Sequence, residues 1–174
     1  MKLLILGPAG SGKGTQAKLI SEHYKIPHIS TGDLIREEIA SGSVFGKKLE
    51  QLINKGNLVS DEDVLKLLKQ RLDASKSGFI LDGYPRNLNQ AKTLDKITTI
   101  NAVIFLDVKR KIIIKRNISD NREKKALLDI LGKIDKSWQD PKSYNSKDVK
   151  LLVYKNNTKQ DLENIKVSLR KLLK

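Results

Sequence analysis

GPAGSGKGT, at residues 7–15, is the strongest structural signal in this 174-residue chain. It follows the apolar run of residues 2–6, which is typical of a strand buried on both faces, and it opens a helical pattern over residues 12–24. Glycines allow backbone N–H groups to turn towards an anion, and a helix N-terminus adds partial positive charge. A lysine at this spacing can reach the outer phosphates of a nucleotide. The sequence therefore predicts a phosphate-binding loop.

One position departs from the general form of such a loop, which has Ser or Thr directly after the lysine. Here Gly14 stands between Lys13 and Thr15. Thr15 remains a candidate to hold Mg²⁺, either directly or through water. A glycine-rich turn between a strand and a helix that binds no ligand is the alternative, and the position of Lys13 weighs against it.

Short apolar runs alternate with helical patterns along the first two thirds of the chain. Further runs typical of strands cover residues 26–30, 78–82 and 102–108. Helical patterns cover residues 31–40, 45–55, 61–74 and 87–94. This alternation predicts an α/β sandwich, with helices on both faces of a central parallel sheet.

Local signals also suggest how some helices begin, and they weaken after residue 108. Thr31 or Asp33 could cap the helix at 31–40, and Ser60 resembles the cap of the helix at 61–74. The later part of the chain contains weaker helical patterns at residues 110–116, 122–138 and 161–173, with a possible last strand at 151–154.

Composition excludes several classes of protein. The chain has no Cys, so a disulfide scaffold, a cysteine nucleophile and a thiolate zinc site are excluded, and His23 and His28 alone cannot form a zinc site. No apolar run approaches the ~20 residues that a membrane span needs, so we expect a cytoplasmic protein without a membrane segment. Aromatic residues make up 5%, which weighs against a nucleic-acid stacking platform.

The charge is strongly positive and unevenly distributed. The chain carries a net +14, and residues 101–174, with 19 basic and 9 acidic residues, account for +10 of it. A basic half favours phosphate-bearing partners, whereas lysines that only solvate helices are the equally weighted alternative.

Two further segments indicate a second phosphate site. They are STGDLIR at residues 30–36 and LDGYPR at residues 81–86, and Gln90 follows the second. In each, an arginine follows a turn that contains glycine at the end of a predicted strand, where ligands gather in parallel sheets. The guanidinium group of an arginine can bind a phosphate through two parallel hydrogen bonds. Arg36 taken alone is better explained by a solvated salt bridge, and the neighbouring motif is what favours a phosphate site; Asp82 could equally cap a helix.

Four segments in this order and spacing resemble the adenylate kinase family: GPAGSGKGTQ, STGDLIREEI, GNLVSDEDV and FILDGYPRNLNQA. The resemblance covers about residues 1–108. It implies one P-loop kinase domain over residues 1–174, with a nucleoside monophosphate-binding insertion at 30–60 and a short lid at about 117–137. It also implies transfer of the γ-phosphoryl group of ATP to AMP, with Mg²⁺ and without zinc. Members with short lids are often monomers, so a monomer is expected.

The resemblance assigns roles to individual residues. ATP would be bound by Gly10, Ser11, Gly12, Lys13, Gly14, Thr15 and Arg116. AMP would be bound by Thr31, Arg36, Asn57, Leu58, Val59, Gly83, Arg86 and Gln90. Lys13, Arg86, Arg116 and Arg122 would be catalytic. Thr15 and Asp82 would hold the metal, Asp82 through water.

Base preference can be argued from two of these side chains. The amide of Gln90 can pair with the edge of adenine, and Thr31 offers a hydroxyl beside it, so AMP is the favoured acceptor. Another nucleoside monophosphate remains an alternative acceptor. A slow ATPase, or a nucleotide sensor built on the same fold, is a third possibility.

The predicted lid departs from the family pattern. Arg116 fits its position, but Asp120 stands where the next lid arginine is expected, and Arg122 could replace it with a small shift. Lysines occupy positions where the family has an acidic pair and a further arginine: Lys124, Lys125 and Lys133. Lysine is a point charge and does not reproduce the arginine fork. The sequence of the lid therefore does not determine the turnover rate or the identity of the phosphoryl acceptor.

Overall fold

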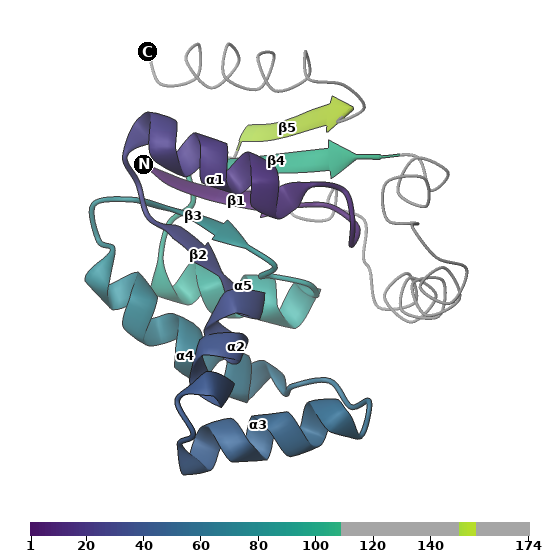
Figure 1. Cartoon of the computed structure of the whole chain (residues 1–174). Helices are drawn as coiled ribbons and strands as arrows, with labels where there is room; N and C mark the ends of the chain where they lie inside the picture. Colours follow the sequence, from purple (N-terminus) through teal and green to yellow (C-terminus); the bar gives the residue numbers. More distant parts are fainter. Residues whose placement is uncertain (109–149, 156–174) are drawn as a thin grey trace.

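A five-stranded parallel sheet forms the centre of the computed structural model, which describes residues 1–108 and 150–155 (Figure 1). The order of the strands across the sheet in this part of the chain is β2-β3-β1-β4-β5. The strands are β1 (Lys2–Leu6), β2 (His28–Ser30), β3 (Phe79–Asp82), β4 (Ala102–Asp107) and β5 (Lys150–Lys155). The helices are α1 (Lys13–Tyr24), α2 (Thr31–Ala40), α3 (Val44–Asn54), α4 (Asp61–Ala74) and α5 (Leu88–Ile97).

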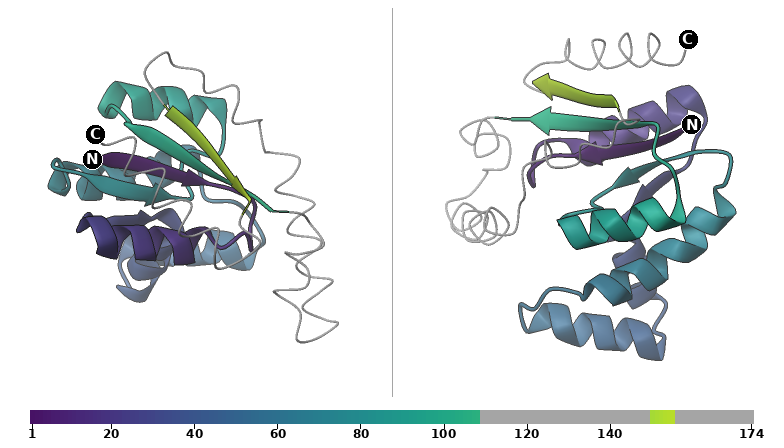
Figure 2. Two further views of the ribbon diagram at one scale, coloured as in Figure 1. Left: turned by 90° about the horizontal axis from the view of Figure 1, so that it is seen from above. Right: turned by 180° about the vertical axis from the view of Figure 1, so that it is seen from behind.

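Helices cover both faces of the sheet, as the alternating pattern predicts. In the view from above, the sheet lies between α1 in purple and α5 in teal (Figure 2). Alternate residues of β1 point to the two sides, so Leu3 and Ile5 pack with α1 in one buried cluster. Leu4 and Leu6 belong to a second cluster, to which α4 and α5 contribute. The apolar run of β1 is therefore buried on both faces, as expected for a central parallel strand.

The parallel register sets which strand ends lie beside one another. Ile5 of β1 pairs with Asp82 of β3, and Ser30 of β2 also pairs with Asp82. Consequently β1, β2 and β3 end at the same edge, and the segments that follow them meet there.

The helices α2 and α3 form an arm that extends from the sheet, with α3 at its far end (Figure 1). An exposed ion pair joins α2 to α4, from Arg71 to Glu37 at 2.7 Å. A second pair joins α3 to α4, from Lys48 to Asp63 at 3.1 Å. The exposed pair of Arg71 with Glu37 contributes little stability, whereas Asp63 in the second pair is partly buried.

The helix caps correct one expectation from the sequence and confirm another. Neither Thr31 nor Asp33 caps α2: the hydroxyl of Ser30 accepts a hydrogen bond from the backbone N–H of Asp33 at 3.3 Å. Strand β2 runs directly into α2, so its last residue becomes the cap and Thr31 is the first helical residue. The predicted cap of α4 is correct, because the Ser60 hydroxyl accepts from the N–H of Asp63 at 3.1 Å.

Most predicted elements are confirmed, with shifted boundaries. Strand β2 begins at His28, two residues later than predicted, and α5 continues to Ile97. The predicted last strand is present as β5. The helices predicted at 110–116, 122–138 and 161–173, and the lid at about 117–137, lie outside the described residues. None of the helices within the described ranges is long and apolar enough to cross a membrane.

Gly46 is the contact point between α2 and α3, and its replacement tests the packing of the arm. A Cβ atom there would lie 2.1 Å from the backbone oxygen of Glu38. We expect Gly46→Ala to force the helices apart and to lower the free energy of unfolding by about 1–3 kcal/mol, measured by urea denaturation. The exposed neighbour Lys47→Ala should stay within about 0.5 kcal/mol of the parent chain. A Gly46→Ala protein as stable as the parent would contradict this packing.

Candidate functional site

The loop after β1 is rich in glycine and leads directly into the first turn of α1. Gly10 and Gly12 have φ angles of 76° and 91°, which favour glycine. A Cβ atom on Gly7 would lie 2.9 Å from the backbone oxygen of Leu106, so the start of the loop has no room for a side chain. Gly12 is the N-cap of α1 and supplies no side-chain hydrogen bond to the helix. The first turn of α1 therefore keeps the N–H groups that suit a phosphate.

Lys13 folds back over this loop. Its Nζ atom donates a hydrogen bond to the backbone oxygen of Pro8 at 2.9 Å. Burial lowers the pKa of Lys13, and the negative charge of Asp82 partly offsets that effect. An ammonium group that has lost part of its hydration and lies against the loop before α1 is well placed to take a phosphate as its partner.

Asp82 lies beside the phosphate-binding loop. It is the last residue of β3, is 8% exposed, and has its Oδ2 atom 3.7 Å from the position of a Cβ on Gly14. His28 Nε2 lies 3.6 Å from the same oxygen. From the sequence alone, His28 is notable only because the two histidines cannot by themselves form a zinc site. The alternation of side chains along β2 places it on the face of Asp82, but that neighbour becomes visible only once the strand order is known.

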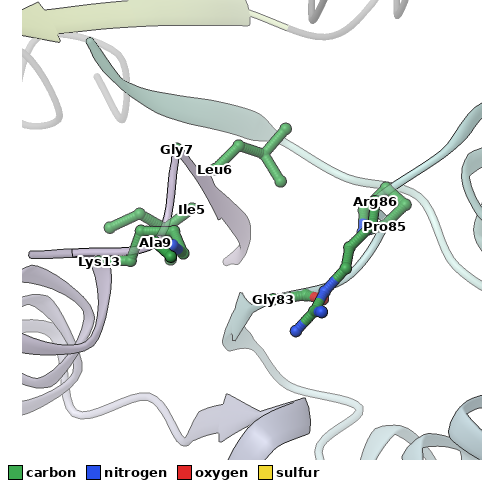
Figure 3. Close-up of a pocket in the computed structure, with 8 residues that line it drawn as sticks. All are labelled: Ile5, Leu6, Gly7, Ala9, Lys13, Gly83, Pro85 and Arg86. Atoms are coloured by element: carbon green, nitrogen blue, oxygen red, sulfur yellow. The ribbon is translucent and has the colours of Figure 1, made fainter. Parts of the chain in front are cut away.

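A small cavity of about 90 Å³ joins the loops after β1 and β3. Figure 3 shows Lys13 and Ala9 on its phosphate-loop side and Gly83 and Arg86 on the other. Arg86 donates from Nε to the backbone oxygen of Gly83 at 2.8 Å. Two cations from different strand ends therefore line one small space.

A larger cavity of about 390 Å³ opens between α2, α4 and the start of α5. Its volume lies in the range of small-molecule sites. The lining includes seven of the eight residues predicted to bind AMP: Thr31, Asn57, Leu58, Val59, Gly83, Arg86 and Gln90. Gly83 and Arg86 line both cavities, so they lie at the junction between the phosphate-binding loop and this larger space.

Arg36 is the predicted residue that does not line the larger cavity. Its exposed guanidinium forms an ion pair with Asp33, one turn earlier on α2. The hydrogen bonds from Arg36 and Ser30 lower the pKa of Asp33. The structure thus shows Arg36 in the salt bridge that the sequence left open as an alternative. The Thr31 hydroxyl also has an internal partner, since it donates to the backbone oxygen of Asp82 at 3.3 Å.

Gln90 is held by residues that sequence reasoning missed. Its Nε2 atom donates to Asp61 Oδ1 at 2.5 Å, and Asn87 Nδ2 donates to Asp61 Oδ2 at 3.1 Å. Burial and the charge of Asp61 raise the pKa of the neighbouring Tyr84 to about 12. The acidic start of α4 could have signalled Asp61, but helix-dipole stabilisation explains such a residue equally well.

The two residues expected to hold a metal ion lie at the start of α1 and at the end of β3. In the described ranges, 1–108 and 150–155, no group of three or more His, Asp or Glu side chains could hold a metal ion. Mg²⁺ that arrives with a nucleotide needs fewer protein ligands, because phosphates and water supply most of its oxygens. Thr15 is exposed on the first turn of α1, and Asp82 lies beside that turn. Arg116 and Arg122 lie outside the described residues.

Comparisons with known proteins agree with this geometry. The family model described as "Adenylate kinase" matches residues 5–162. An adenylate kinase of Xanthomonas campestris pv. campestris is 48% identical over 123 residues, which cover 67% of this chain and 66% of that protein. One from Prochlorococcus marinus is 49% identical over 127 residues, or 70% of each chain.

A third relative is matched over a smaller share of its own length. The adenylate kinase of Francisella philomiragia is 49% identical over 119 residues, covering 67% of this chain and 55% of that protein. The chain thus spans between about half and 70% of the length of the curated relatives that it matches. The family model nevertheless covers most of the sequence, including the phosphate-binding loop from Gly7 onwards and both cavities. The chain belongs to the adenylate kinase family.

Proposed function

We propose that the protein transfers the γ-phosphoryl group of ATP to AMP and forms two molecules of ADP. One observation carries the proposal: Gly83 and Arg86 line both the small cavity that contains Lys13 and the large cavity that contains Gln90. A donor phosphate at the first cavity and an acceptor phosphate at the second would meet beside Arg86. Such an arrangement favours in-line transfer, because it holds the two phosphates close together beside a cation that offsets the charge on the transferred group.

On the donor side, the N–H groups of residues 10–15 would bind the ATP phosphates. Lys13 would exchange the Pro8 oxygen for a phosphate oxygen, and its charge would offset the negative charge that spreads over the migrating group. The family generally uses Mg²⁺ with ATP. We propose Thr15 and Asp82 as its protein partners, Asp82 through water; the ion would neutralise charge on the phosphate oxygens.

On the acceptor side, AMP would occupy the larger cavity. Gln90 would face the base, and Thr31 and residues 57–59 would line its surroundings. Arg86 would bind the acceptor phosphate at the junction of the cavities, and Arg36 would join it after leaving Asp33. The attacking phosphate oxygen is already an anion, so the reaction does not require a general base.

The proposal extends to the whole chain as one kinase domain over residues 1–174. Residues 30–60 would form the insertion that binds the nucleoside monophosphate, and residues at about 117–137 would form a short lid. Arg116, just before the lid, and Arg122 within it would place positive charge beside the transferred phosphoryl group and help to exclude water. We also propose a cytoplasmic monomer with ATP and AMP as partners, as the resemblance to short-lid members implies.

The test is ADP formation from magnesium ATP with AMP, CMP, UMP or GMP as acceptor, and without an acceptor. AMP should give the fastest turnover. Lys13→Ala should reduce it by 10²-fold or more, because a cation is lost from the transition state. The exposed Lys18→Ala, on the same helix, is the matched control and should retain the parent rate.

Three results would refute or redirect the proposal. ADP formation without an acceptor would indicate an ATPase. A faster rate with CMP, UMP or GMP than with AMP would identify that monophosphate as the preferred acceptor. ATP binding without any ADP would indicate a nucleotide sensor on a kinase fold.

The ion pair of Arg36 with Asp33 gives a second prediction. Because Asp33 competes with the acceptor phosphate for Arg36 and repels that phosphate, Asp33→Asn should lower the KM for AMP about two- to fivefold, in line with the weak energy of exposed pairs. The KM for ATP, measured in the same assay, should stay unchanged. An unchanged or higher KM for AMP would show that Arg36 does not reach the acceptor.

A further inference from the structure

The side-chain amide of Gln90 lies between two groups of opposite hydrogen-bonding character. The backbone N–H of Arg86 donates to Oε1 at 2.6 Å, and Nε2 donates to Asp61 Oδ1 at 2.5 Å. A backbone N–H can only donate, and a carboxylate can only accept. These two partners therefore fix which end of the amide is the oxygen and which is the nitrogen.

Asp61 is itself fixed by a second hydrogen-bonded connection. Its Oδ2 atom accepts from Asn87 Nδ2 at 3.1 Å. The oxygen of the Asn87 amide accepts from the backbone N–H of Gln90 at 2.8 Å, so the nitrogen must face Asp61. Asp61 is also the first residue of α4, where the positive end of the helix favours a carboxylate. The network thus joins the starts of α4 and α5.

Asp61, Asn87 and Gln90 all line the cavity of about 390 Å³. With the two contacts above, the Gln90 amide keeps one N–H and one oxygen lone pair for a ligand. A 6-aminopurine presents the complementary pair, because N1 accepts and the 6-amino group donates. A 6-oxopurine presents the reverse, since its N1–H donates and its O6 accepts. It would require the amide to be rotated by 180°.

Rotation of the amide would create two unfavourable contacts. The Gln90 oxygen would face the carboxylate of Asp61, and the Gln90 nitrogen would face the N–H of Arg86. We propose that Asp61 is a positioning residue that sets the base preference of the cavity, by holding the Gln90 amide in the orientation that accepts a 6-amino purine and rejects a 6-oxo purine. This inference rests on the proposed function, because it assumes that the cavity binds the acceptor base.

The variant Asp61→Asn tests the orientation with almost no change in shape. Gln90 Nε2 and Asn87 Nδ2 donate to different carboxylate oxygens of Asp61, and an asparagine at this position has an acceptor at only one of the two places. If that oxygen stays with Asn87, the new Nδ2 faces Gln90 and favours the rotated amide. The substitution therefore removes the penalty on a 6-oxo base, in addition to removing a charge.

The experiment compares AMP with inosine monophosphate, which differs by the exchange of the 6-amino group for an oxygen. The ratio of kcat/KM for the two acceptors, with magnesium ATP, is measured for the parent chain, Asp61→Asn and Asp61→Ala. Dissociation constants of both monophosphates from calorimetry give the same ratio without turnover. Glu62→Gln is the matched control, because it removes an exposed carboxylate from the same turn of α4.

We expect the preference for AMP to fall about tenfold or more in Asp61→Asn and to stay within about twofold in Glu62→Gln. Equal losses for AMP and inosine monophosphate would overturn the inference, since they would indicate a merely structural role. An unchanged ratio in both Asp61 variants would also overturn it. The parent chain reports separately on the proposed function: failure to use AMP there refutes that function, while the calorimetric ratio still decides the role of Asp61.

Discussion

The parallel pairing of β1 with β3 determines where the loops of the site meet. It aligns Ile5 with Asp82, so the glycine-rich turn after β1 and the turn after β3 open at the same edge of the sheet. Alternate side chains of β1 and β3 are buried in two different clusters, one on each face of the sheet. A shift of the pairing by one residue would move each side chain to the face that now packs its neighbour. The same register that completes the core therefore brings Lys13 and Arg86 to one small cavity.

The groups expected to bind substrates already have partners within the chain. Lys13 donates to the Pro8 oxygen, Arg86 to the Gly83 oxygen, and Arg36 forms an ion pair with Asp33. Binding of a phosphate would exchange these contacts for new ones, and the net gain from each exchange is small compared with a hydrogen bond formed in isolation. Strong binding of a phosphate therefore requires that several side chains exchange their internal contacts for the same phosphate. Such side chains come together at the junction of the two cavities, so the junction contributes more to binding than any single cation.

The part of the site that could be predicted from sequence is the part that depends on local pattern. The phosphate-binding loop, the strand ends and the cap at Ser60 follow from residues close together in the chain. The Ser30 cap was missed because its prediction requires knowing that β2 and α2 are directly joined. Asp61 and His28 were missed for a different reason, since their contacts with Gln90 and Asp82 join residues 29 and 54 positions apart. The role of Arg36 at the acceptor phosphate stays a prediction, since its own helix supplies a nearer partner in Asp33.

In the proposed function, two phosphate-bearing substrates meet beside Arg86. Calorimetry with a bisubstrate compound, two adenosines joined through five phosphates, can decide whether they do. We expect one molecule bound per chain, at least 10²-fold tighter than ATP or AMP alone, because one ligand then occupies both cavities. The gain should largely disappear in Arg86→Ala, whereas ATP binding should change much less. Binding of the compound no tighter than that of ATP would contradict the claim.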